Sequence, residues 1–432
     1  MSSNSNIINN RQKFEKAIKV GKLISVTGLT QISVQLIGFV SGLLILRLLP
    51  TQEYALYTIA NTMLGTMIVL ADGGIASGVM ARGGKVWKDR SKLGAVLSTG
   101  IDLRRKFAVA SILVSVPLIS FLLNKHNASW LLISLIVLSL IPAFYMSLTG
   151  TLYEIASKLQ QDILPLQKVQ VKVNVGRLML LTLTMFLFPF ASIALLAYGI
   201  PQIFANRRLR KNSEKYVDWT QKANDTERSE ILNIVKRTLP VSIYYCVSGQ
   251  LTIWIISLFG STSSLAQIGA LGRLSMLFSV FSVMFATLVV PRFARMSYIR
   301  TTVVKFFIRI QLMLYLLGGG LVIVFYLASD FFLWILGAKF AGFHLEVLYI
   351  AILGSVNLLS SSTNQLLSSR GLVVPPQIFI SIAILVQIIF LFTVQVNEVI
   401  GVLQYGIYTA GAIYLIRLSY FFIKIKSNES YN

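Results

Sequence analysis

The chain has 432 residues, of which 55% are hydrophobic and only 13% are charged, and its mean hydropathy is +0.73. Soluble domains carry about 25% charged residues. Uncharged runs recur along the chain, such as Leu23–Leu46 with 24 residues and Asn127–Tyr153 with 27. Since about 20 apolar residues cross a bilayer and only helices or closed barrels do so without unpaired backbone groups, the composition excludes a soluble protein. It predicts an all-α polytopic membrane protein.

The apolar runs predict about twelve transmembrane helices. In chain order they cover residues 24–48, 54–78, 106–124, 129–152, 164–187, 190–206, 239–259, 265–290, 306–328, 344–368, 374–395 and 399–423.

The formal charge of +23 is distributed by membrane side. The segments that we place towards the inside, which include the inner ends of some predicted helices, carry 35 of the 39 Lys and Arg residues, and the other four are Arg47, Lys125, Arg273 and Lys339. This is the positive-inside pattern, and it predicts that both termini are cytoplasmic. Anionic lipid would attract the basic loops, so we expect the bilayer as a partner and no nucleic acid.

Motifs of catalysis and of cofactor binding are missing from the sequence. There is no GxxxxGK[ST] segment for nucleotide phosphates, and Cys246, His126 and His344 supply no tetrahedral set of metal ligands. The longest outer connection has only about fifteen residues, near 329–343, which is short for a catalytic domain. We therefore expect no enzyme activity, no metal and no cofactor.

The longest polar segment, residues 207–237, leaves six predicted helices on each side. Weak similarity between the halves predicts two parallel six-helix bundles around a central cavity, and such transporters bind substrate between their halves near the midplane. The predicted organisation is a basic N-terminal segment (1–22), a first bundle (23–206), a cytoplasmic basic linker (207–237), a second bundle (238–424) and a cytoplasmic tail (425–432).

One predicted helix carries an unexpected arginine. Arg177 lies 11 residues before Phe188, roughly 16 Å deep at 1.5 Å per residue. A cation at that depth is costly unless it faces a partner or a wet cavity. It shares one helix face with other polar residues, which are Gln167, Gln170, Asn174 and Thr184.

Other predicted helices carry similar polar or small-residue stripes. The candidates for a central cavity are therefore Arg177, Arg273, Gln31, Gln35, Asn174, Gln170, Asn357 and Asn364. Two alternatives stay open: small-residue and amide stripes also mark helix packing, and Arg177 and Arg273 could extend to the membrane surfaces instead. Asp72 we expect at a helix end, paired with a basic neighbour such as Arg82.

Four stretches of the chain resemble a known family of membrane proteins. They are "LRLLPTQEYALYTIA" (46–60), "LADGGIASG" (70–78), "RTLPVSIYYCVSGQLTIWIISLFG" (237–260), and "LGRLSMLF" through "VVPRFAR" (271–295). With these the chain resembles bacterial polysaccharide repeat-unit flippases, the O-antigen and capsule branch of the multidrug/oligosaccharidyl-lipid/polysaccharide exporter superfamily. One departure is that Gln250, Leu251 and Thr252 supply no acidic residue where many relatives carry one.

The resemblance implies a flippase that moves polyprenyl-pyrophosphate-linked oligosaccharides to the outer leaflet of the bacterial inner membrane by alternating access. Arg177 and Arg273 would then contact the pyrophosphate, because guanidinium groups match phosphate oxygens. Gln31, Gln35, Asn174 and Asn357 would contact sugars. A polysaccharide polymerase and chain-length machinery are further expected partners.

Two other functions compete with this interpretation. A multidrug or other small-molecule exporter would have the same fold, but cationic drugs favour acidic cavities. A membrane polymerase or ligase of lipid-linked glycans would need a larger outer loop than this chain has.

Overall fold

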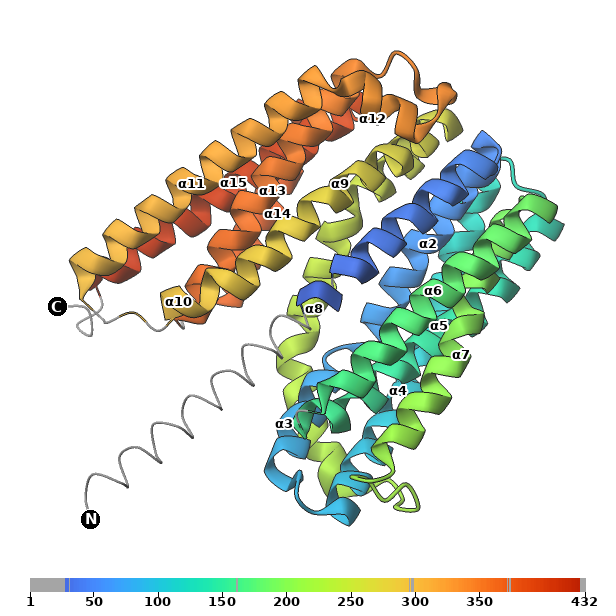
Figure 1. Ribbon diagram of the computed structural model, residues 1–432, viewed down its shortest axis with the longest axis vertical. Coiled ribbons are helices and arrows are strands. Elements are labelled where there is room, and N and C mark those ends of the chain that lie inside the picture. The colour runs from blue at the N-terminus through green and yellow to red at the C-terminus, as the bar shows by residue number, and fades with distance from the viewer. Residues whose placement is uncertain are drawn as a thin grey trace.

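A computed structural model describes residues 28–30, 32–160, 162–294, 296, 299–370, 372 and 374–427. Gln31 lies outside the described residues. Within them the secondary structure is entirely helical, with no strand, which confirms the predicted fold class. Elements far apart in the sequence lie side by side along nearly parallel directions (Figure 1).

The helices follow one another with short connections. They are a first helix Gly28–Leu48, then α2 (Thr51–Asp72), α3 (Ile75–Val86), α4 (Arg90–Lys125), α5 (Trp130–Leu159), α6 (Ile163–Leu187), α7 (Ala191–Ser213), α8 (Asp225–Phe259), α9 (Thr262–Leu288), α10 (Val290–Ala294), α11 (Arg300–Leu327), α12 (Ser329–Leu336), the 3₁₀ turn η1 (Ala338–Phe340), α13 (His344–Ser369), α14 (Pro376–Thr393) and α15 (Val399–Ser427).

Ten of the described helices are long and apolar enough to cross a membrane. Two predicted spans, now α6 and α7, fall outside this group although they have 25 and 23 residues. Basic residues explain the difference: α6 carries Lys168, Lys172 and Arg177, and the last turns of α7 carry four more. Both helices nevertheless pack with α5 in the same bundle (Figure 1).

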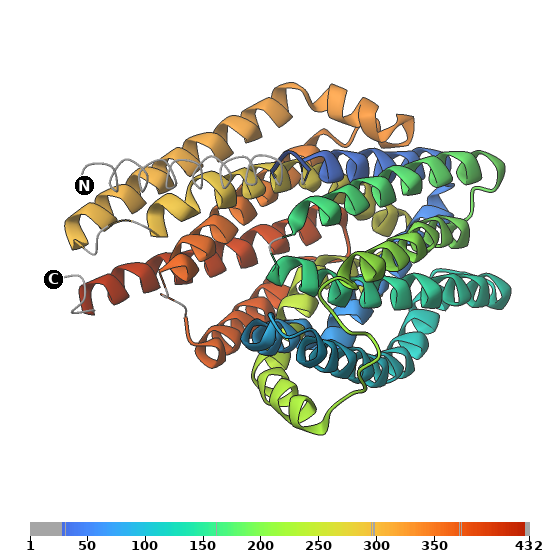
Figure 2. The same cartoon turned by 60° about the horizontal axis from the view of Figure 1, so that its bottom comes forward.

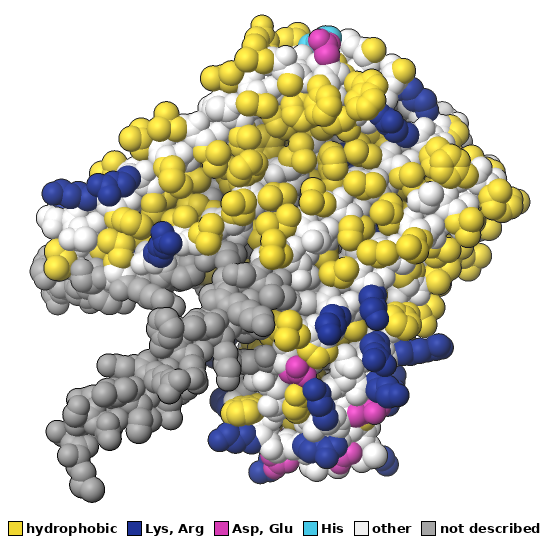
Figure 3. Space-filling model, viewed as in Figure 1, with side chains coloured by type: hydrophobic (Ala, Val, Ile, Leu, Met, Phe, Trp, Pro, Cys, Tyr) yellow, Lys and Arg dark blue, Asp and Glu magenta, His cyan; other side chains and the backbone are white. Residues whose placement is uncertain are grey.

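The helices form two lobes that meet at one end of the molecule. The first helix to α7 make the N-terminal lobe, α9 to α15 make the C-terminal lobe, and α8 runs between them (Figure 1). The largest apolar core contains residues of both lobes, including Tyr54 and Met63 of α2 with Leu265 of α9 and Phe332 of α12. Lys and Arg side chains gather towards the other ends of the lobes (Figure 3). We call these the basic end, and the meeting point of the lobes the opposite end.

The predicted helix 54–78 is in fact two helices. The turn between α2 and α3 consists of Gly73 and Gly74, whose φ angles are +49° and +94°. Residues with a Cβ rarely adopt such angles. Space is also limited, because a Cβ on Gly74 would lie 2.0 Å from Thr238 Oγ1 of α8. This turn therefore brings α8 close against the N-terminal lobe.

Much of the predicted basic linker is helical. α7 continues to Ser213 and α8 begins at Asp225. The first turns of α8 are held on the N-terminal lobe by two ion pairs, Arg82 Nε to Glu227 at 2.8 Å and Arg228 to Asp102 at 3.0 Å. Figure 2 brings this end forward, with the start of α8 beside α3 and α4. The domain boundaries stay a prediction, and the linker is part of the folded structure.

Candidate functional site

Hydrogen bonds between the lobes close the opposite end of the molecule. Arg47, at the end of the first helix, donates to the carbonyls of Ile335 (3.0 Å) and Trp334 (2.6 Å) of α12. In the other direction, Lys339 of the C-terminal lobe donates a hydrogen bond to the Leu49 carbonyl at 3.2 Å. These bonds join segments almost 290 residues apart in the chain.

A second set of contacts joins α4 to the α8–α9 corner. His126, directly after α4, is buried and lies 3.0 Å from both the Ser257 carbonyl and the Thr262 hydroxyl. Lys125 donates to the carbonyl of Leu258. Both sets lie at the opposite end, and together they fix the lobes against each other there.

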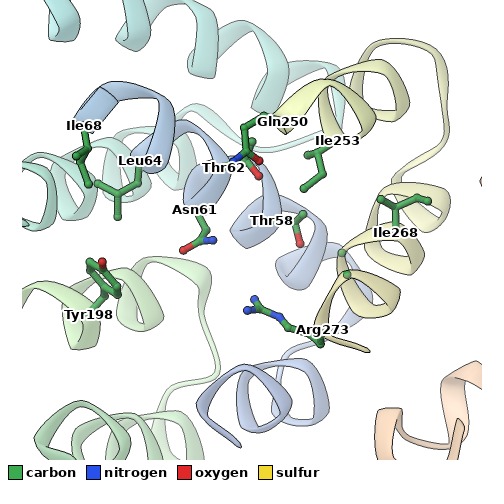
Figure 4. A pocket seen from close by; sticks show the side chains of 13 residues that line it. Thr58, Asn61, Thr62, Leu64, Ile68, Tyr198, Gln250, Ile253, Ile268 and Arg273 are labelled. Atoms are coloured by element: carbon green, nitrogen blue, oxygen red, sulfur yellow. The ribbon is translucent and has the colours of Figure 1, made fainter. Parts of the chain in front are cut away.

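Behind this closed end lies a cavity of about 350 Å³ between the lobes, which we call the central cavity. It is bounded by α2 of one lobe and by α8 and α9, with Tyr198 of α7 (Figure 4). The side chains of Arg273 and Asn61 extend into it. The described lining residues include no Asp or Glu; its polar members are Thr58, Asn61, Thr62, Tyr198, Gln250 and Arg273.

Arg273 is the charged group of the central cavity. Its Nε donates to the Tyr54 hydroxyl at 3.4 Å, and its guanidinium lies 5.9 Å from the centre of the Tyr57 ring. Both contacts are with neutral groups of α2. The side chain also passes Gly42, where an added Cβ would lie 3.0 Å from it. Arg273 therefore crosses the interface between the lobes as a cation.

A second cavity, the inner cavity, has a volume of about 660 Å³ and lies between α2, α4, α5 and α8. Gly65, Ile68 and Gln250 line both cavities, so the two adjoin. The inner cavity is lined by Asp72, at the end of α2, and by Arg104 of α4. It thus extends the central cavity towards the basic end.

Asp72 has a different partner from the one predicted. It pairs with Arg104, whereas Arg82 binds Glu227 and Glu230. The reason is that α2 ends at Asp72 and α3 turns away, while α4 runs alongside α2. Arg104 also donates to the Leu148 carbonyl and the Thr151 hydroxyl of α5, so this ion pair ties three helices together.

Arg177 lies next to the central cavity without lining it. Its guanidinium carbon is 4.0 Å from the centre of the Tyr198 ring, and Tyr198 is itself a lining residue. This is a cation–π contact. The Nε atom of Arg177 is buried without a hydrogen-bond partner among the described residues. Arg177 thus faces into the lobe and its charge is separated from the cavity by one ring.

The other predicted residues of α6 make local contacts. Asn174 Nδ2 donates to the Gln170 carbonyl one turn earlier, at 2.8 Å. Gln170 Nε2 donates to Glu154 of α5 at 3.4 Å. Gln35 is half-buried on the first helix, and neither it nor these α6 residues lines the described cavities.

Asn357 belongs to a third cavity. This one lies inside the C-terminal lobe, between α8, α13, α14 and α15, and has a volume of about 280 Å³. Asn364, two turns further along α13, is half-buried and lines none of the described cavities. The predicted set therefore falls in several places, and of its described members only Arg273 lines the central cavity.

Sequence reasoning missed the polar face of α2. Thr58, Asn61, Thr62 and Gly65 line the central cavity, and Asp72 lies two turns further along the same helix. Their spacing of three and four residues places them on one face, which was the available signal. Within the described residues, no group of three or more His, Cys, Asp or Glu is placed to hold a metal.

Comparison with solved structures identifies the architecture. An inward-facing multidrug resistance MATE family transporter of the MOP superfamily matches with a TM-score of 0.71 at 13% identity, over 93% of this chain and 100% of that one. The chain has a MATE fold. An outward-facing MATE structure gives 0.65 at 11% identity over 94% and 96% of the two chains. A MATE transporter from Vibrio cholerae gives 0.63 at 13% identity over 96% and 98%.

These similarities concern the fold alone. They do not distinguish between the functions that proteins of this fold carry out. No protein-family model matches the sequence, and the comparison with curated proteins gives no match either.

Proposed function

We propose that the protein is a membrane transporter that works by alternating access. The observation that carries this proposal is a cavity between two lobes that are hydrogen-bonded to each other at the opposite end, and this cavity adjoins a second one that lies towards the basic end. The positive-inside pattern puts the basic end in the cytoplasm, so the cavity would face inward. The higher TM-score against the inward-facing MATE structure is consistent with this.

The substrate class has two candidates. The comparisons favour multidrug export, because the neighbours are described as multidrug transporters. The charge of the central cavity favours an anion, since Arg273 lines it and none of its described lining residues is acidic. A lipophilic cation would meet an unfavourable potential there.

We therefore propose an anionic amphiphile as the substrate, and a polyprenyl-pyrophosphate-linked oligosaccharide as the specific form. Arg273 would bind phosphate oxygens, and Asn61, Gln250 and the threonines of α2 would bind hydroxyl groups. The bilayer would hold the prenyl chain. A polysaccharide polymerase and a bacterial inner membrane location follow only if this specific form is correct.

A binding experiment on the purified protein separates the two substrate classes. We expect a short-chain polyprenyl pyrophosphate to bind and a lipophilic cation such as ethidium not to compete with it. Arg273→Gln should weaken this binding about tenfold or more, because hydrogen bonds to charged groups are the strong ones. The matched control is Arg300→Gln, which removes an exposed arginine at the start of α11 and should leave affinity unchanged. Tight ethidium binding with no effect of Arg273→Gln would instead establish the multidrug function.

A further inference from the structure

Five exposed basic residues lie where α6 and α7 approach the basic end, on the outer surface of the N-terminal lobe. They are Lys168 and Lys172 of α6 and Arg207, Arg208 and Lys211 of α7, and we call them the α6–α7 basic cluster. Within the described residues, none of the five forms an ion pair with Asp or Glu. In contrast, the basic residues that join α8 to this lobe are paired with carboxylates. The described part of the chain thus supplies no counter-ion to the cluster.

The hairpin of α6 and α7 places the two sets of charges at the same depth. The helices pack on each other near the basic end through four apolar side chains, Leu166, Val169, Ala205 and Leu209. Lys172 lies 15 residues before the end of α6, and Arg207 lies 16 residues after the start of α7. These spacings are roughly 23 and 24 Å at 1.5 Å per residue. Lys168 and Lys211 lie one turn further. Since the hydrocarbon core of a bilayer is about 30 Å thick, the cluster lies at the level of one layer of headgroups.

Each helix also carries an apolar stripe that leads to the cluster. On α7, Ile200 and Phe204 are 52% and 54% exposed and lie one to two turns before Arg207. On α6, Met179 and Leu183 are 68% and 66% exposed and continue the face of Lys172 at helical spacing. Figure 3 shows this part of the lobe covered by apolar side chains, with Lys and Arg below them. Such a surface fits acyl chains along its length and a negative charge at its basic edge.

We propose that the α6–α7 basic cluster is a binding site for an anionic phospholipid of the inner leaflet. Basic side chains of both helices hold the headgroup phosphate, and the apolar stripes hold the acyl chains. Basic sites between helices at the cytoplasmic side of a membrane recognise anionic headgroups in this way. A soluble acidic partner fits less well, because the apolar stripes continue the same surface into the depth of the bilayer. The proposal does not depend on the transported substrate.

The test measures which lipids contact the cluster in a reconstituted bilayer. A fluorophore is attached to Ile200→Cys in a Cys246→Ala background, and its quenching by brominated phosphatidylglycerol and by brominated phosphatidylcholine is compared. The reference position is Ile378→Cys, which is 55% exposed on α14, a helix without Lys or Arg. The attraction of one Lys or Arg to anionic lipid corresponds to about a fivefold change in affinity. We therefore expect at least this preference for phosphatidylglycerol at Ile200→Cys and none at Ile378→Cys.

Variants of each helix test whether the cluster causes this preference. Lys168→Gln/Lys172→Gln on α6 and Arg207→Gln/Lys211→Gln on α7 should each bring the ratio of the two affinities close to one. All four side chains are exposed, so both variants should fold. The charge-matched control, Lys85→Gln/Lys88→Gln, removes two exposed lysines at the end of α3 and directly after it and should keep the wild-type preference.

Three results would overturn the proposal. The first is equal quenching by the two lipids at Ile200→Cys in the otherwise wild-type protein. The second is a preference that the control variant lowers as much as the cluster variants do, which would indicate attraction by net charge alone. The third is an effect of only one of the two cluster variants, because the proposed site needs both helices.

Discussion

At the scale of single residues, the two membrane arginines have different surroundings. Arg273 lines the central cavity directly, whereas Arg177 reaches it only through the Tyr198 ring. A cation held over an aromatic face contributes roughly 0.5–2 kcal/mol, more when desolvated. Arg177 thus contacts Tyr198 on the side away from the cavity and adds positive charge behind the ring.

Replacement of Arg177 tests this pairing. We expect Arg177→Ala to abolish transport of the native substrate at normal protein levels, and Arg177→Lys to restore it in part, because lysine keeps the charge but loses the planar guanidinium. Tyr198→Phe should be close to wild type since the ring remains. Transport in cells at matched expression measures the effect.

The snorkelling interpretation of Arg177 predicts a different pattern. A side chain that only extends to the membrane surface should tolerate lysine fully and alanine nearly so. Equal transport by all three Arg177 forms would remove this residue from the site.

At the scale of helices, α2 and α9 pack closely across the interface between the lobes. A Cβ on Gly269 of α9 would lie 2.5 Å from Thr58 Oγ1 of α2. Gly269→Leu should therefore separate the two helices and favour opening of the opposite end. We expect a cysteine at the exposed Ser263 to react faster with a membrane-impermeant thiol reagent in this variant. Gly272→Leu is the matched control, since a Cβ there meets nothing within 4 Å, and it should label at the wild-type rate.

The contact that His126 makes directly after α4 should depend on pH. The Ser257 carbonyl can only accept, so His126 Nε2 donates to it and the neutral Nδ1 accepts from the Thr262 hydroxyl. Burial lowers the pKa of His126, and the neighbouring Lys125 lowers it further, while the bond to Ser257 acts the other way. Closure therefore favours the neutral ring. The contribution of this contact to the closed state is complete above the ordinary histidine pKa, about 6.5. It is lost as the pH falls through the lowered pKa of His126.

We expect a low pH at the opposite end of the molecule to separate the lobes there. A cysteine at Thr262 would itself remove the contact with His126, so the probe is a cysteine at the exposed Ser263. Its labelling rate should rise below pH 6.5 in the wild type, whereas in His126→Gln it should no longer depend on pH. A wild-type rate that is constant with pH, after correction for thiol ionisation, contradicts this role of His126.

At the scale of the whole molecule, the two ends should lie on different sides of the membrane. Cysteines at Lys125 and within residues 214–224 should label from opposite sides in intact cells, with Lys125 accessible from outside. Both positions are at helix ends in the structure, so access depends on topology. Labelling of both from outside would contradict the positive-inside orientation and the inward-facing assignment.

The sequence alone determined the class of the protein, because membrane insertion depends on the length and hydrophobicity of each segment. Runs such as Leu23–Leu46 and the distribution of Lys and Arg needed no knowledge of tertiary contacts. Tertiary structure decided which polar side chains share a cavity, because a polar helix face can point at a neighbouring helix as well as at water. Asn357 and Arg273 each lie on a polar or small-residue stripe of a predicted helix, but they line different cavities. Asp72 pairs with Arg104 rather than Arg82 because the Gly73–Gly74 turn directs α3 away from it.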